Sequence, residues 1–217
     1  MNYILSSCRL GNVKENLYTH KVLNTHCTKE VIQYIKYLSN EILIPHNMEK
    51  FIFRGVYLNN IKIIDKTKLQ NEFLNSKNIF IEICSRKKYI KNNFYIHHLA
   101  ADSGDASKNV NHEKNKKEKN FELVLQNKEE LEKDILEILN LLKEKNVYFI
   151  THIDCKIEKR KSLINDLVII FKKHNIKYFN PSDFGNELHK YMNDYNHYNE
   201  KGLLLLSKYI KSHFNIY

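Results

Sequence analysis

The sequence predicts an α/β fold, a three-layer α/β/α sandwich built on a central, mostly parallel sheet. Short runs of apolar, β-branched and aromatic residues alternate with longer segments whose apolar residues recur at helical spacing. Three successive strand–helix units favour a parallel sheet with right-handed crossovers. A chain of 217 residues is long enough for one sizeable core and short for two, so we expect a single domain over residues 1–217.

The first half of the chain alternates expected strands and helices. An apolar run over residues 2–6 predicts the first strand. Residues 10–24 show no clear period, so we expect a loop there that lies over the candidate site described below. Thr28 is a suitable N-cap for a helix whose apolar stripe comprises Val31, Ile32, Ile35 and Leu38. The other expected elements are a β-prone segment at 51–53, a short helix at 66–75, and a strand at 79–84 that runs into a polar turn at 85–89.

The second half resumes this alternation after a polar interruption. Residues 101–120 are dominated by Lys, Asn and Glu, so we expect a mobile, lysine-rich surface loop there. Asn199 is a suitable N-cap for the last expected helix, which has one apolar face. The expected elements are an extended segment at 121–125, helices at 127–142, 160–174 and 203–214, and strands at 147–150 and 176–179.

A net charge of +10 raises nucleic acid as a partner. The basic residues are mostly Lys, and they accompany abundant Asn, Ile and Tyr with few Gly, a mixture typical of A- and T-rich coding. No Arg-rich helix or aromatic–basic repeat accompanies the charge, so nucleic-acid binding is the least favoured hypothesis. Such a surface suits anionic small ligands, for example phosphorylated sugars or coenzyme A.

The four cysteines indicate neither a disulfide framework nor a metal site. Cys8, Cys27, Cys84 and Cys155 are widely spaced, and without a signal sequence we expect reduced thiols in a cytoplasmic protein. No apolar run is long enough to span a bilayer, so we expect no membrane partner. His152 and Cys155 form an H-x-x-C without a second pair at ligand spacing, so no metal is expected.

A polar turn, Ser6-Ser7-Cys8-Arg9, follows the first expected strand. Open α/β proteins place their reactive groups at the carboxyl ends of parallel strands, which makes Cys8 the candidate nucleophile. The alternative is that Cys8 is a small buried hydrophobe at a strand end, because free cysteines are commonly buried.

A second polar turn follows the strand expected at 79–84. Ser85, through its hydroxyl or backbone N–H, or Arg86, through its guanidinium, can stabilise negative charge there. The alternative for Arg86 is a solvated basic residue. His26 precedes a helix start, so a capping or solvent role is preferred for it over substrate contact. His152 follows a strand and is a candidate to line the pocket.

Near its end the chain contains Asp194 and His197 in a D-x-x-H pattern, followed by Tyr198, Asn199 and Gly202 at the start of an apolar helix. An Asp three residues before a His can hold the imidazole so that its other nitrogen faces a nucleophile. This stretch resembles the last sequence block of the SGNH (GDSL-type) hydrolase superfamily. The alternative is a loop whose Asp and His only support the packing of the helix.

The resemblance implies an SGNH-hydrolase or flavodoxin-like sandwich with a Cys8–His197–Asp194 triad. Where the superfamily has Gly-Asp-Ser, this chain has Ser6-Ser7-Cys8, similar to the cysteine-bearing GSCFA-like or capsule-biosynthesis acetyltransferase-like relatives. It also lacks the Gly and the oxyanion Asn of the superfamily. The residues implied for the oxyanion or substrate are therefore Ser7, Arg9, Ser85 and Arg86.

Three functions follow as hypotheses. The first is acyl transfer, as an esterase or deacetylase when water accepts the acyl group and as an acetyltransferase when a sugar does, with carbohydrate implied by the resemblance. No cofactor is required, although a transferase needs acetyl-CoA or another acyl donor. The second is an inactive binding module on the same fold, and the third is the basic nucleic-acid binder. The absence of glycine-rich phosphate motifs argues against kinases and dinucleotide-dependent dehydrogenases.

Overall fold

The computed structural model describes residues 1–7, 10, 13, 23–54, 56, 65–101, 120–152, 158–193 and 197–216. The expected lysine-rich loop lies outside these ranges except for its two end residues, as does most of the expected loop at 10–24. Cys8, Arg9, Cys155 and Asp194 also lie outside the described residues.

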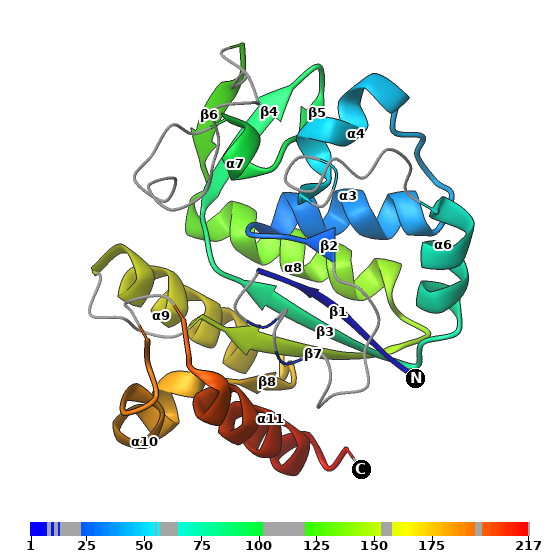
Figure 1. The fold of residues 1–217 in the computed structure, drawn as a ribbon. Coiled ribbons are helices and arrows are strands. Elements are labelled where there is room, and N and C mark those ends of the chain that lie inside the picture. Colours follow the sequence, from blue (N-terminus) through cyan, green and yellow to red (C-terminus); the bar gives the residue numbers. More distant parts are fainter. Residues whose placement is uncertain are drawn as a thin grey trace.

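The central sheet contains five parallel strands in the order β2-β1-β3-β7-β8 (Figure 1). Their bounds are Asn2–Ser6 for β1, Leu23–Asn24 for β2, Asn78–Ile83 for β3, Asn146–Thr151 for β7 and Tyr178–Phe179 for β8. Renumbered along the sheet this is the 2-1-3-4-5 order of flavodoxin-like folds. The order reverses between β1 and β3, and ligands of such folds bind beyond the carboxyl ends of the strands at that point.

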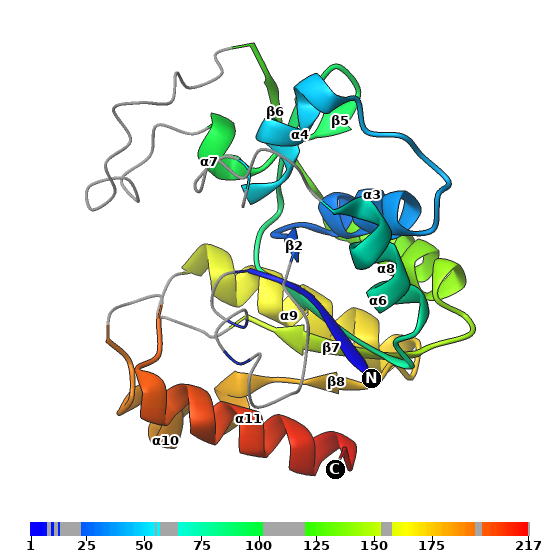
Figure 2. The same cartoon turned by 45° about the vertical axis from the view of Figure 1, so that its right-hand side comes forward.

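Helices cover both faces of this sheet, which confirms the predicted three-layer sandwich (Figures 1 and 2). Alternate strand residues divide between two buried clusters: Ile79 and Ile81 face one, and Ile4 and Phe80 face the other. The first cluster packs on α3 (Thr28–Leu38), α6 (Lys66–Leu74), α8 (Lys128–Leu141) and α9 (Glu158–Lys173). The second packs on α10 (Gly185–His189) and α11 (Glu200–Phe214).

A second, antiparallel sheet of three strands lies on the α3 side of the molecule (Figures 1 and 2). Its strands are β4 (Lys87–Lys91), β5 (Phe94–Tyr95) and β6 (Glu122–Leu125), in the order β5-β4-β6, with α4 (His46–Ile52) and α7 (His98–Ala101) nearby. Asn92 and Asn93, both at positive φ, join β4 to β5 in a two-residue hairpin. Gln33 of α3 holds β5 through hydrogen bonds with both backbone groups of Tyr95, each 2.8 Å long.

Four local predictions are wrong, the first because residues 23–24 of the expected loop at 10–24 form β2. Residues 51–53, expected as a β-prone segment, are the end of α4 and its C-cap, and residues 87–89 of the expected polar turn begin β4. The N-cap of α3 is Cys27 instead of Thr28. The other expected strands and helices are confirmed, with ends displaced by a few residues.

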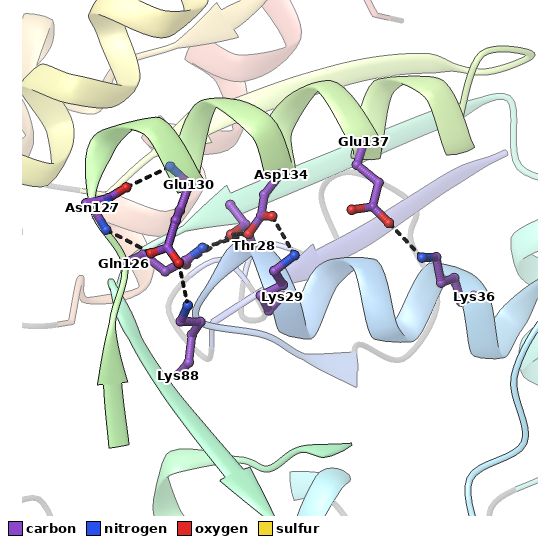
Figure 3. Close-up of polar contacts among 9 residues, drawn as sticks. All are labelled: Thr28, Lys29, Lys36, Lys88, Gln126, Asn127, Glu130, Asp134 and Glu137. Carbon is purple, nitrogen blue, oxygen red and sulfur yellow. Dashed lines mark hydrogen bonds and ion pairs between the residues drawn. The ribbon is translucent and has the colours of Figure 1, made fainter. Parts of the chain in front are cut away.

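Thr28 instead takes part in a polar network between α3 and α8 (Figure 3). Its hydroxyl donates to Asp134 Oδ2 at 2.6 Å, and Gln126 Nε2 donates to the same oxygen at 2.6 Å. Lys29 Nζ lies 2.7 Å from Asp134 Oδ1. Asp134 is buried, so this network satisfies a carboxylate inside the helix layer. At the start of α8, Asn127 and Glu130 form a reciprocal capping box.

Asparagine occupies the left-handed backbone positions of the described residues. Asn40, Asn175 and Asn215 have φ between 52° and 62°, and each follows the end of a helix. Glycine is the usual residue at such helix ends, and Asn is the tolerated substitute. In this glycine-poor sequence, Asn therefore adopts the positive-φ conformation at these helix ends and in the β4–β5 hairpin.

Candidate functional site

The carboxyl ends of β1, β3 and β7 meet in a buried hydrogen-bonded group formed by Ser7, Glu82 and His152. Glu82 Oε2 accepts from the Ser7 backbone N–H at 3.0 Å and from the Ser7 hydroxyl at 2.6 Å. Glu82 Oε1 lies 2.9 Å from His152 Nδ1. All three residues are at most 2 % exposed. One carboxylate thus connects the exits of three neighbouring strands at the point where the strand order reverses.

This arrangement positions the turn that precedes residue 8. Because Glu82 binds both the backbone and the side chain of Ser7, it fixes the direction in which the chain leaves β1. The carboxylate stands between the hydroxyl and the imidazole, so these three residues are not ordered as a nucleophile–base–acid triad. Sequence reasoning missed Glu82, although an acidic residue inside the apolar strand Ile-Phe-Ile-Glu-Ile was a usable signal.

The loop before α11 lies against the same group. One pocket is lined by Glu82 and His152 together with Leu10, which follows the first strand, and Tyr198, which follows His197; its full lining is Leu10, Glu82, Ile150, Thr151, His152, Pro181, Tyr198 and Leu206. His152 therefore borders this small pocket, while its part in a substrate site stays a prediction. Leu10, two residues after Cys8, and Tyr198, one residue after His197, thus line the same pocket.

Backbone hydrogen bonds and a cap hold this loop. The N–H of Asn193 donates to the carbonyl of His197 at 2.7 Å, and the N–H of Asn199 donates to the carbonyl of Tyr191 at 2.7 Å. The Asn199 side chain caps α11 by accepting from the Gly202 N–H at 2.9 Å, as predicted. His197 is half-buried. The loop is thus tied at both ends around the histidine.

Replacing Gly202 with Ala is expected to destabilise the protein by about 1–2 kcal/mol, although Ala is the better helix former. A Cβ at this position would lie 2.7 Å from Tyr191 Cβ and 3.1 Å from Tyr198 Cβ, so the helix or the loop must move. Urea denaturation followed by circular dichroism measures the loss. The matched control is Lys201→Ala at the neighbouring exposed position. Equal stability of the two variants would show that the close packing has no energetic importance.

Among the other predicted site residues, the structure describes Ser85 and Arg86. The Ser85 hydroxyl accepts from the Lys87 N–H at 3.0 Å, and the Ser85 N–H donates to the carbonyl of His26 at 2.9 Å. The Arg86 guanidinium is paired with Asp166 of α9. Charge stabilisation by these residues stays a prediction, and no described contact joins Ser85 or Arg86 to His197.

Three histidines form a second group at the exit of β2. His26 follows β2, His97 lies between β5 and α7, and His98 is the first residue of α7. One candidate ligand nitrogen from each ring lies within 4.8 Å of the others. The centroid of the His26 ring lies 4.8 Å from that of the His97 ring and 4.2 Å from that of the His98 ring. The His26 carbonyl accepts from the N–H groups of Cys84 and Ser85, which places this histidine beside the end of β3.

Burial controls the ionisation of this second group. Burial, aided by the charges of His98, His26 and Arg54, holds the pKa of His97 well below its usual range. Burial raises the pKa of Glu30 to about 8, against the opposing hydrogen bonds from the backbone of His26 and Cys27. His97 is therefore a neutral imidazole at neutral pH. Sequence reasoning had no reason to pair His97 and His98 with His26, because seventy residues separate His26 from His97.

The fold and the site define a doubly wound α/β protein with a polar group at its switch point. Residues 7–103 match the model of the TviD N-terminal domain. The match begins at the exit of β1 and includes β2, β3, β4, β5 and both histidine segments, and it covers less than half of the chain. No curated protein matches the sequence. Within the described residues, no helix is long and apolar enough to cross a membrane.

Proposed function

We propose that the protein is an acyl-transfer enzyme acting on carbohydrate, with Cys8 as nucleophile, His197 as general base and Asp194 as the partner that orients His197. The observation that carries the proposal is the pocket lined by Leu10, Glu82, His152 and Tyr198, because it brings the neighbours of Cys8 and His197 together. The Ser7–Glu82 hydrogen bonds add a rigid support one residue before the proposed nucleophile.

The proposed reaction has two steps. In the first, His197 accepts the Cys8 proton and the thiolate attacks the acyl carbonyl; collapse of the tetrahedral intermediate breaks the bond to the leaving group, which takes the proton from His197. In the second, a sugar hydroxyl gives its proton to His197 and attacks the thioester, which releases the acylated sugar and restores the Cys8 thiol. Water in place of the sugar gives hydrolysis.

The family match supports carbohydrate as the substrate class. It includes Cys8, and the TviD N-terminal domain is a domain of Vi capsule biosynthesis, in agreement with the resemblance to capsule-biosynthesis acetyltransferases. The chain's net charge of +10 also suits an anionic acyl donor such as acetyl-CoA. The donor, the acceptor and the three triad roles are parts of the proposal.

The test is formation of an acetyl-enzyme. After incubation with acetyl-CoA or p-nitrophenyl acetate, intact-mass spectrometry should detect one acetyl group, which peptide mapping places on Cys8. Cys8→Ala should abolish the adduct, and His197→Ala should slow its formation by about 100-fold because the general base is lost. Release of the acyl group only when an oligosaccharide is added indicates transfer, and release in buffer indicates hydrolysis.

Cys84→Ala is the matched control, because Cys84 is a partly exposed cysteine that follows β3 at the same sheet edge. It should form the adduct at the unmodified rate. An unmodified protein that forms no acetyl adduct, and whose Cys8 is alkylated no faster than Cys84, would contradict the proposal and favour a binding module.

A further inference from the structure

The His26, His97 and His98 group has no part in the proposed acyl transfer. Two chain segments far apart in sequence bring the three rings together, and each ring offers one nitrogen within 4.8 Å of the others. Three ligands at about 2.0–2.1 Å around a tetrahedral Zn²⁺ are roughly 3.4 Å apart. The rings therefore need only small side-chain rotations to share one ion.

His97 supplies the second, independent observation. Its residue is 1 % exposed, and its buried Nε2 finds no hydrogen-bond partner within the described part of the chain. Its Nδ1 accepts from the Leu99 N–H at 3.2 Å, a long contact. A buried polar atom without a partner in a native fold calls for an explanation, and coordination of a metal ion provides one.

A carboxylate, that of Glu30, lies beside His26. Glu30 Oε2 accepts from the His26 backbone N–H at 2.6 Å and lies 3.6 Å from His26 Nδ1. A ligating histidine commonly directs its other ring nitrogen at a carboxylate, which fixes the ring and raises its basicity. The positive charge of Arg54 opposes a cation at this place, because it interacts electrostatically with His97.

We propose that His26, His97 and His98 bind one Zn²⁺, with Glu30 as the outer-shell partner of His26. Three neutral imidazoles select zinc and similar transition metals over Mg²⁺ or Ca²⁺, which prefer oxygen ligands. Three protein ligands leave the fourth tetrahedral position for water or substrate, the pattern of catalytic zinc sites. The His26 side chain is 12 % exposed, so the group lies close to the protein surface.

Binding of the metal to the full chain, cleared of metal with a chelator, tests the proposal. Zn²⁺ should bind with a stoichiometry of one per chain in competition with a chromophoric chelator. Co²⁺, used as the spectroscopic probe, should give the intense visible bands of a tetrahedral site, and Zn²⁺ should remove them. His26→Gln and His98→Gln should each weaken Zn²⁺ binding by at least about 100-fold, and Glu30→Gln by about 10-fold.

His46→Ala is the matched control, because the His46 side chain is 83 % exposed and is paired only with Glu49 among the contacts seen. It should bind Zn²⁺ like the unmodified chain. Should a glutamine variant fail to fold, the Zn²⁺ stoichiometry and the Co²⁺ spectrum of the unmodified chain still show whether the chain binds one tetrahedral metal ion. A chain without stoichiometric binding, or folded His26 and His98 variants that bind normally, would overturn the site. Cys8→Ala should leave Zn²⁺ binding unchanged, so this result is separate from the acetylation test.

Discussion

Replacing Glu82 with Ala is expected to lower the free energy of unfolding by about 4 kcal/mol. The substitution removes the acceptor of both Ser7 hydrogen bonds and the partner of His152 Nδ1, and it leaves a cavity between β1, β3 and β7. Removing one member of a buried charged group is costly because its partners remain in a poorly solvating environment. Equilibrium urea denaturation of the unmodified chain and the variant measures the difference.

Two further variants separate the hydrogen bonds from the general effect of changing a strand residue. Glu82→Gln keeps the shape and one carbonyl acceptor, so a smaller loss of about 1–2 kcal/mol is expected. Glu122→Ala alters an exposed glutamate of β6 and should change stability by less than about 0.5 kcal/mol. If Glu82→Ala proved as stable as Glu122→Ala, the carboxylate would not be the connection between the three strands.

Replacing Asp134 with Ala is expected to cost about 3 kcal/mol. Asp134 is 1 % exposed, and its two oxygens bind the Thr28 hydroxyl, the Gln126 amide and the Lys29 ammonium (Figure 3). The variant leaves these groups at the buried contact between α3 and α8 without their shared acceptor. Thermal and urea unfolding followed by circular dichroism measure the loss.

Glu137, one turn further along α8, provides the comparison. It pairs with Lys36 at 2.6 Å, but each side chain is 32 % exposed, so water screens the pair. Glu137→Ala should therefore cost less than about 1 kcal/mol. Similar losses for Asp134→Ala and Glu137→Ala would mean that burial does not distinguish these two ion pairs.

The central sheet was predictable because its signals are local. The β-branched run at 79–84 and the apolar stripes of α8 and α11 are each contained within one element, and the Asn199 cap is a single-residue signal. A fully buried parallel sheet also needs continuous apolar strands, which few other structures require. These patterns predict the fold class without knowledge of which strands are neighbours.

The small antiparallel sheet was missed for an identifiable reason. β4 reads Lys-Lys-Tyr-Ile-Lys, so its basic residues resemble a solvated turn, and the Asn-Asn hairpin lacks the usual glycine. Conversely, residues 51–53 are aromatic and β-prone, yet they end a helix because Phe53 packs against Tyr34 and Tyr37 of α3. Tertiary packing overrode local propensity in that segment.

The candidate site was predictable only in part. The pattern of strand exits predicts that the end of β1 and the loop before α11 are neighbours, and the pocket lined by Leu10 and Tyr198 joins residues near these two segments. The roles of Cys8, His197 and Asp194 stay predictions. An acidic residue inside an apolar strand marked Glu82 as unusual, but its pairing with Ser7 and His152 depends on strand order. The three-histidine group depends on the path of the segment after β5, which no local pattern encodes.

The late position of α11 in the chain has a consequence for synthesis on the ribosome. Leu206 and Ile210 of this helix pack on Ile4, Phe80 and Tyr148, which belong to β1, β3 and β7. Until residues 200–214 have left the exit tunnel, α11 cannot cover the side chains of Ile4, Phe80 and Tyr148, and these form an exposed apolar surface that is prone to aggregation. A nascent chain can therefore form the helices of the opposite layer before α11 is available to cover this apolar face.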